Sequence, residues 1–161
     1  MNIESVIATT KYEPRPYQTR IIQTAYESFF GLYKDRSGRL QDACSSVLIE
    51  SPTGSGKTCM SLLALKVIQH QIPDLTIGWV AMRRNLLKQA AHENVEKGVN
   101  VQNIHFVSMY DKFPAALHQA KEEGKPIMLV PDEAHHDATN SMANLHNALK
   151  PKFVLGMTAT P

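Results

Sequence analysis

The amino-acid sequence predicts an α/β fold, a mainly parallel sheet with helices on both of its faces. Short apolar runs, typical of buried strands, alternate with longer segments whose apolar residues recur at helical spacing. Repeated strand–helix units form right-handed crossovers, which make successive strands parallel. A length of 161 residues is that of one ordinary domain, and we therefore expect residues 1–161 to form a single domain.

Five short apolar runs are expected to be the strands of this sheet. They are Ser46–Glu50, Thr76–Met82, Ile104–Met109, Ile127–Val130 and Phe153–Met157. Pro131 follows the fourth run and has no backbone N–H to donate. The fourth strand should therefore end at Val130, or the proline nitrogen should face away from the neighbouring strand.

The segments before and between these strands have the apolar periodicity of amphipathic helices. The expected helices are Pro16–Tyr33, Lys57–Gln71, Arg84–Lys97, Asp111–Glu123 and Ser141–Lys150. The first of them begins at a proline, which is favoured in an initial helical turn, and it should pack on the sheet. The fourth is the weakest, because Pro114 is tolerated only in the first turn of a helix.

The composition is that of an ordinary globular protein, with 43% apolar and 20% charged residues. The 17 basic residues exceed the 15 acidic ones by 2, which is too few to indicate a nucleic-acid partner from charge alone. Cys44 and Cys59 are isolated, which indicates neither a disulfide framework nor a zinc cluster. The N-terminus lacks a basic start before an apolar run, and no stretch approaches about eighteen apolar residues. We expect a soluble, cytoplasmic protein without a membrane segment.

The segment Ser51–Thr58 reads Ser-Pro-Thr-Gly-Ser-Gly-Lys-Thr and lies between the first strand and a helix, as a phosphate-binding loop does. Its glycines let backbone N–H groups converge on phosphate oxygens, and the new helix adds the positive end of its dipole. Lys57 would reach the β- and γ-phosphates, and the Thr58 hydroxyl would coordinate Mg²⁺. The candidate nucleotide-binding residues are Thr53, Gly54, Ser55, Gly56, Lys57 and Thr58. A plain glycine-rich turn is the alternative, and the coincidence of strand, loop, lysine and threonine argues against it.

Two acids, Asp132 and Glu133, follow the fourth predicted strand, and ligands of open α/β sheets bind at strand ends. Asp132 would hold Mg²⁺, and Glu133 would polarise the water that attacks the γ-phosphate. Alone, Pro-Asp-Glu is typical of a solvated turn, but its pairing with the phosphate-binding loop favours catalysis. The adjacent His135–His136 and the later His146 could instead ligate a metal, although neighbouring histidines rarely converge on one ion.

Four motifs in chain order resemble the motif series of superfamily 2 helicases and translocases. They are Arg15-Pro16-Tyr17-Gln18, Ser51–Thr58, Asp132-Glu133-Ala134-His135 and Thr158-Ala159-Thr160. That family commonly has alanine or serine in place of the first glycine of the loop, which accounts for Ser51. The Asp-Glu-Ala-His-His sequence is similar to the DEAH-like branch, which includes restriction-enzyme-type motors. The resemblance spans nearly the whole chain and implies a RecA-like P-loop fold that binds ATP and Mg²⁺.

The resemblance also implies roles for single residues. Gln18 would read the adenine edge with Arg15 or Tyr17 nearby, although a glutamine at a helix start is also an ordinary surface residue. Thr158 and Thr160 would couple hydrolysis to movement through hydrogen bonds around the motif histidine. The catalytic residues would be Lys57, Asp132, Glu133 and His135.

Two further segments occupy the places of nucleic-acid motifs in that family. Val80–Gln89 is similar to the first of them, in which a strand-end basic residue meets a phosphate, and Arg84 is the best match. The alternative is a solvated arginine at the start of a helix. Phe106–Tyr110 holds the place of the second motif, but its residue types are common in cores and at strand ends, which favours a structural role.

The sequence therefore predicts the ATP-binding lobe of a nucleic-acid helicase, with DNA favoured over RNA as the partner. Family motors have two RecA-like lobes. The resemblance implies that residues 1–161 are the first lobe. The second lobe is absent from these residues and would be supplied in cis or in trans. A double-strand DNA translocase of a restriction or remodelling enzyme is the nearest alternative. Another alternative is a non-catalytic interaction module, whose partner would sense the bound nucleotide through Ser141–Lys150 or the Thr158 segment. The intact Lys57, Asp132 and Glu133 argue against this alternative.

Overall fold

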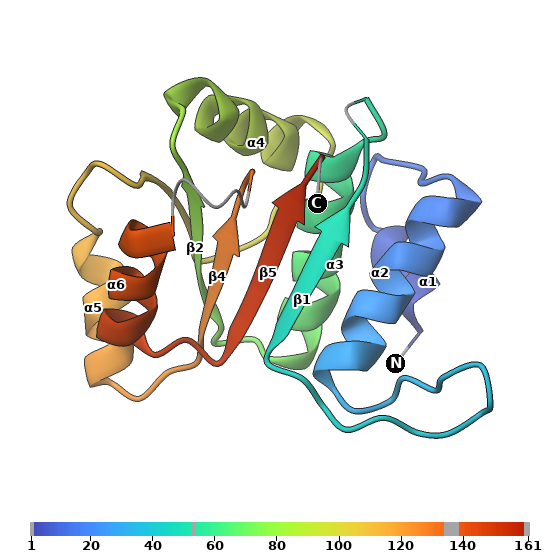
Figure 1. The fold of residues 1–161 in the computed structure, drawn as a ribbon. Coiled ribbons are helices and arrows are strands. Elements are labelled where there is room, and N and C mark those ends of the chain that lie inside the picture. Colours follow the sequence, from blue (N-terminus) through green and yellow to red (C-terminus); the bar gives the residue numbers. More distant parts are fainter. Residues whose placement is uncertain (1, 53, 134–138, 160–161) are drawn as a thin grey trace.

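A five-stranded, all-parallel sheet forms the centre of the structure (Figure 1). The computed structural model describes residues 2–52, 54–133 and 139–159. The strands are β1 (Ser46–Glu50), β2 (Thr76–Ala81), β3 (Ile104–Ser108), β4 (Ile127–Pro131) and β5 (Phe153–Thr158). They lie in the order β1-β5-β4-β2-β3, so that β1 and β3 are its edges. The predicted α/β fold class and all five predicted strands are confirmed.

Helices cover the sheet on both faces (Figure 1). They are α1 (Ile3–Ile7), α2 (Pro16–Phe29), α3 (Lys57–Gln71), α4 (Arg84–Glu96), α5 (Ala115–Glu122) and α6 (Thr139–Leu149). Helices α3 and α4 lie on one face, and α5 and α6 pack together on the other. Helix α2 contacts both α3 and β1, as expected for a helix that packs on the sheet.

Several element bounds differ from those predicted. Helix α2 ends at Phe29 because Gly31 adopts a left-handed φ of 69°, which a continuing helix cannot have. Helix α5 begins only at Ala115, since the residue before Pro114 is disfavoured in helical geometry. Strands β2 and β3 each end one residue earlier than predicted and β5 ends one later, while α4 ends one residue before Lys97 and α6 runs 139–149.

Strand β4 includes Pro131, which the sequence analysis allowed only if the proline nitrogen faces away from the neighbouring strand. The backbone N–H of Asp132 donates to the carbonyl of Val80 on β2, at 2.8 Å. Because successive residues of a strand direct their N–H groups to opposite sides, the nitrogen of Pro131 faces away from β2. Strand β4 therefore continues past Val130, and the prediction that it ends there is wrong. The proline nitrogen lies on the β5 side, where pairing is interrupted between the Leu129–Val154 pair and the Asp132–Met157 bridge.

Helix α1 was missed by the sequence reasoning. It has only five residues, too few for an apolar period to be recognised, yet Ile3, Val6 and Ile7 are buried and it contacts α3. The side chain of Asn2 caps it by accepting the N–H of Glu4 at 3.0 Å.

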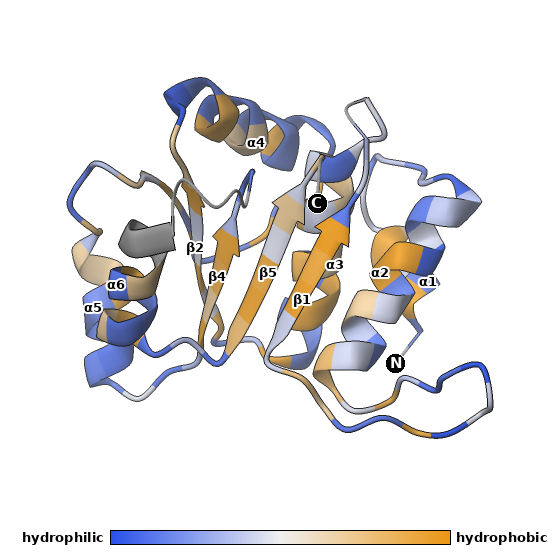
Figure 2. Ribbon diagram, viewed as in Figure 1, coloured by the Kyte–Doolittle hydropathy of each residue, from blue (hydrophilic) through white to orange (hydrophobic). Residues whose placement is uncertain are grey.

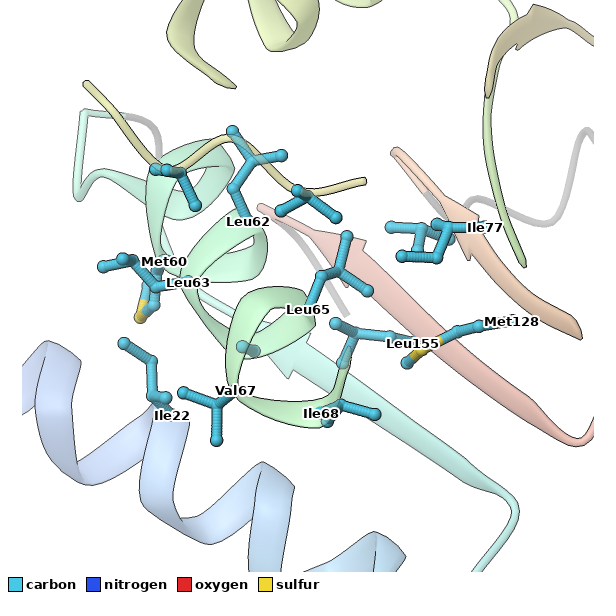
Figure 3. Packing of buried hydrophobic residues seen from close by; sticks show 14 of the residues in the cluster. Ile22, Met60, Leu62, Leu63, Leu65, Val67, Ile68, Ile77, Met128 and Leu155 are labelled. Atoms are coloured by element: carbon cyan, nitrogen blue, oxygen red, sulfur yellow. The ribbon is translucent and has the colours of Figure 1, made fainter. Parts of the chain in front are cut away.

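Helix α3 carries the phosphate-binding loop at its start, and ten of its fifteen residues are buried. Figure 3 shows Leu65 and Ile68 of α3 lying beside Leu155 of the sheet, with Met128 next to Leu155. Its other sides meet α1, α2 and α4. Figure 2 accordingly shows hydrophobic colour concentrated on the strands and α3, with hydrophilic colour on much of α4 and α5. A helix that packs against neighbours on several sides in this way is anchored in the core. Its first residues are therefore held in fixed positions.

No helix within the described residues is both long enough and apolar enough to cross a membrane.

Glu93 on α4 gives a testable prediction about stability. Within the described part of the chain, its Oε2 atom is buried without a hydrogen-bond partner. Burial raises the pKa of Glu93 above its ordinary value of 4.5, and Lys97 offsets this only in part. Because ionising Glu93 destabilises the folded state, Glu93→Gln should raise the free energy of unfolding at neutral pH by about 1 kcal/mol.

The pH dependence of this gain identifies its cause. Below pH 4.5 both the folded and unfolded chains hold the proton, so the wild type and the variant should be almost equally stable. The difference should grow as the pH rises through the raised pKa of the folded state. Urea denaturation at about pH 4 and about pH 7.5 measures it. An equal difference at both pH values would contradict the prediction.

Candidate active site

The candidate site lies at the carboxyl edge of the sheet, where β1 runs into the loop that precedes α3 (Figure 1). Gly54 and Gly56 have φ values of 86° and 79°, in the left-handed region that favours glycine. Gly56 is the N-cap residue of α3. A Cβ atom at Gly56 would lie 2.5 Å from Nε2 of Gln18, so a larger residue would displace that side chain. Both glycines are thus required by the observed backbone path.

Ser51 stands where the general phosphate-loop pattern has glycine, and its side chain has a local use. Its Oγ atom lies 2.5 Å from Oγ of Ser55, forming a hydrogen bond across the loop. Its backbone N–H donates to the carbonyl of Thr158 at 3.1 Å. Thr158, the last residue of β5, is only 1% exposed. The start of the loop is therefore tied both to the loop's own interior and to the neighbouring strand.

The start of α2 holds the other side of the loop. The Tyr17 hydroxyl and the Gln18 Nε2 amide both donate to the carbonyl of Ser55, at 2.7 and 2.9 Å. The Oε1 atom of Gln18 accepts the backbone N–H of Arg15 at 2.8 Å and the Tyr12 hydroxyl at 3.1 Å. Gln18 is 2% exposed, so its amide is buried against the loop, whereas Arg15 is exposed. The structure brings the motif of Gln18 and the loop of Ser55 together, as one site requires.

Lys57 and Glu133 form the central contact of the site. Nζ of Lys57 lies 2.8 Å from Oε1 of Glu133, and the two side chains are 11% and 31% exposed. Glu133 has a left-handed φ of 58°, a conformation uncommon outside glycine and typical of functional turns. Two residues 76 positions apart in the sequence are therefore brought into direct contact.

Asp132 lies beside this pair but is more deeply buried, with 4% exposure. Its Oδ2 atom accepts a hydrogen bond from the indole Nε1 of Trp79 at 3.3 Å. Burial raises the pKa of Asp132, and the indole N–H and the Lys57 ammonium act in the opposite direction. The carboxylate is thus a buried acceptor, stabilised by the indole N–H of Trp79, the backbone N–H of Glu133 and the nearby Lys57 cation.

The donors near the loop fit a magnesium ion. Mg²⁺ prefers oxygen ligands and takes only one or two from the protein, keeping water and phosphate oxygens for the rest. The Thr58 hydroxyl and the Asp132 carboxylate supply ligands of this kind. Among the described residues, no group of three or more His, Cys, Asp or Glu side chains could hold a metal, so they offer no zinc-type cluster.

Some predicted residues fall outside the described part of the chain. These are Thr53 of the loop, His135 of the acidic motif, its neighbours His136 and Asp137, and Thr160. Their predicted roles remain predictions.

Arg84 lies away from the Lys57–Glu133 contact, at the first position of α4. Its Nη2 atom pairs with Oδ1 of Asp111 at 3.1 Å, with side-chain exposures of 72% and 44%. Tyr110, which the sequence assigned to a structural role, is 73% exposed beside Asp111. The pair therefore belongs to a solvent-facing surface at the ends of β2 and β3.

Sequence reasoning missed Tyr12, Trp79 and Asp111. Trp79 sits in a mainly apolar strand, a pattern that indicates core packing and gives no sign of a polar partner 53 positions away. Asp111 adjoins the Phe106–Tyr110 segment and could have been paired with Arg84 by opposite charge, but only the parallel register of β2 and β3 brings them together.

The chain is similar to known proteins in both sequence and structure. Residues 11–103 and 94–161 match the family described as "Type III restriction enzyme, res subunit". No curated protein matches the sequence significantly.

Two similar solved structures are the SWI2/SNF2 ATPase core of Sulfolobus solfataricus in complex with dsDNA and the core domain of that protein. The first has a TM-score of 0.60 and 18% sequence identity, covering 95% of this chain and 33% of its own. The second has a TM-score of 0.62 and 17% identity, covering 95% and 32%. At these identities the likeness is one of fold, and the chain spans about a third of the solved proteins it matches.

Proposed function

Because the chain belongs to the type III restriction enzyme res subunit family, a family of superfamily 2 ATPases, we propose that it is the ATP-binding lobe of an ATP-dependent nucleic-acid helicase. The observation that carries this proposal is the Lys57–Glu133 contact beside a loop with two left-handed glycines. A cation, an acid and converging backbone N–H groups at one helix start are what phosphoryl transfer requires.

The loop and the start of α3 would bind the triphosphate. The left-handed Gly54 and Gly56 open the backbone for phosphate approach, and the helix dipole favours the negative charge. Lys57 would leave Glu133 and contact the β- and γ-phosphates. Gln18, with Arg15 or Tyr17 nearby, would contact the adenine edge while its amide keeps the Ser55 carbonyl in place.

Thr58 and Asp132 would hold Mg²⁺. The ion would neutralise charge on the phosphate oxygens. Glu133, once released from Lys57, would orient the attacking water and accept its proton. His135, Thr158 and Thr160 would couple this step to movement. These intact acid and lysine positions also argue against a purely non-catalytic interaction module.

We further propose that residues 1–161 form one RecA-like lobe that works with a second. In motors of this kind, arginines supplied from outside the phosphate-binding lobe stabilise the transition state and raise the rate by roughly three to five powers of ten. The chain by itself should therefore bind Mg-ATP but hydrolyse it slowly.

Calorimetric titration of the chain with ATP tests this proposal. Binding should be strong in the presence of Mg²⁺ and much weaker when EDTA removes the ion, because the Asp132 carboxylate would then face phosphate without a neutralising charge. Titration with adenosine, which has no phosphates, is the control and should show little heat. Equal binding of ATP and adenosine would rule out a phosphate site at this loop.

Arg84 would contact a nucleic-acid phosphate on the exposed surface beside Asp111. In the free chain Asp111 competes for the same guanidinium. Asp111→Asn should therefore raise affinity for an oligonucleotide by about threefold at low salt. Arg84→Ala should reduce the slope of log affinity against log salt concentration by about one, because one phosphate contact is lost. Fluorescence anisotropy over a series of salt concentrations measures both effects.

The matched control for this surface is Glu122→Gln, an equal change of charge at an exposed position of α5. If Glu122→Gln raises affinity as much as Asp111→Asn, net charge and not the Arg84 contact is responsible. A salt slope unchanged in Arg84→Ala would remove Arg84 from the interface.

A second candidate function is a double-strand DNA translocase of a restriction or remodelling enzyme. Its support is the family description and the dsDNA complex of the similar Sulfolobus solfataricus ATPase core. The same anisotropy series on duplex and single-stranded DNA distinguishes the candidates. Preference for duplex would favour the translocase, and preference for single strands the helicase.

A further inference from the structure

Trp79 combines complete burial with a polar contact to the candidate site. It lies on β2, where its backbone is paired with Val130 of β4 and Phe106 of β3, and it is 0% exposed. Its ring packs against the Phe106 ring, with centroids 5.9 Å apart. An indole N–H is only a donor, and a buried one needs an acceptor. Here that acceptor is Oδ2 of Asp132, at 3.3 Å.

Strand β2 fixes Asp132 at two points. The backbone N–H of Asp132 donates to the carbonyl of Val80, and its side chain accepts the hydrogen bond of the preceding residue, Trp79. Backbone and carboxylate are thus tied to adjacent residues of a central strand. A carboxylate has two oxygens, and only Oδ2 is engaged by the indole.

We propose that Trp79 is a positioning residue for Asp132: the indole N–H of Trp79 holds Oδ2 and so fixes the orientation in which the carboxylate would bind the Mg²⁺ of the bound nucleotide. The inference rests on the proposed function of the site. Loss of a donor that holds a metal-ligating side chain in place typically lowers metal affinity by about 10–100-fold. Trp79 therefore acts on the metal through Asp132 without touching the nucleotide.

An isosteric replacement separates this role from packing. Replacing Trp79 by benzothienylalanine puts sulfur in place of the indole N–H and keeps the size of the ring. The Mg²⁺ concentration that gives half-maximal ATP binding should rise about tenfold. ATP binding without Mg²⁺ should stay unchanged. An unchanged Mg²⁺ dependence in the folded variant would overturn the inference.

Phe106→Leu is the matched control, because it disturbs the same aromatic packing but leaves the indole N–H and Asp132 intact. Its Mg²⁺ dependence should equal that of the wild type. If Phe106→Leu shifts the Mg²⁺ dependence as much as the isosteric replacement, packing explains the effect and the inference fails.

Intrinsic fluorescence provides a second measurement that needs no variant of Trp79. The chain has a single tryptophan, so tryptophan emission comes from Trp79 and responds to changes around its ring, this hydrogen bond included. Adding Mg²⁺ to the ATP-bound chain should change the emission, and Asp132→Asn should abolish that change. Emission that does not respond to Mg²⁺ would overturn the inference. Failure of the wild type to bind Mg-ATP would instead contradict the proposed function and the inference together.

Discussion

Lys57→Ala should lose measurable Mg-ATP binding. Lys57 is the first residue of α3, with an 11% exposed side chain that already contacts an acid at 2.8 Å. A hydrogen bond to a charged group contributes roughly 1.5–3 kcal/mol, and about 1.4 kcal/mol corresponds to a tenfold change in affinity. The variant also leaves the Glu133 carboxylate near the phosphates without the Lys57 cation. Affinity measured by calorimetry should therefore fall by about a hundredfold or more.

Lys66→Ala is the matched control for this prediction. Lys66 lies on the same helix, and its Nζ atom donates to the carbonyl of Val99, away from the loop. Removing it takes one lysine from α3 without touching the site, so ATP affinity should stay at the wild-type value. Unchanged affinity in Lys57→Ala, with a fold intact by circular dichroism, would remove the phosphate site from this loop.

Glu133→Gln should separate nucleotide binding from hydrolysis. The amide cannot accept the proton of the attacking water, and loss of a general base lowers rates by roughly 10²–10⁴. The same change breaks the Lys57–Glu133 ion pair, which ATP must otherwise displace. Affinity for Mg-ATP should therefore rise, by about fivefold if the pair contributes about 1 kcal/mol. Single-turnover phosphate release and calorimetry measure the two effects.

Glu123→Gln provides the comparison, because it breaks the exposed Glu123–Lys125 pair in the turn that follows α5. Neither the affinity for ATP nor the rate should change there. A Glu133→Gln chain that hydrolyses ATP at the wild-type rate would assign the general base to another residue. Weaker binding in that variant would mean that Glu133 helps to hold the nucleotide.

The sequence was most informative where one local pattern determines structure. Strand β1 and helix α3 have the predicted bounds, because an apolar run, a glycine loop and a following proline mark their ends. Helix α1 escaped prediction, since its burial depends on contact with α3 and not on its own short pattern. The start of α5 was placed too early, because the restriction that Pro114 imposes on the residue before it outweighed the apolar periodicity.

The site was predictable as a set of residues but not as a network of contacts. Spacing along the chain marked Lys57 and Glu133 as members of one site, and their direct pairing depends on which strands are neighbours. The sequence assigned Gln18 to an adenine contact, which stays a prediction, while its observed bond to the Ser55 carbonyl required the packing of α2 on α3. Long-range contacts of this kind leave no periodic pattern in the sequence.

The two donors on the Ser55 carbonyl have a consequence for the direction of the next amide. A trans peptide unit is planar, with its C=O and N–H pointing in opposite directions, and the described residues contain no cis peptide. Because Tyr17 and Gln18 turn this carbonyl toward α2, the N–H of Gly56 must point away from α2. An incoming anion would therefore meet a dipole that is already aligned, and binding would lose little backbone entropy at this peptide.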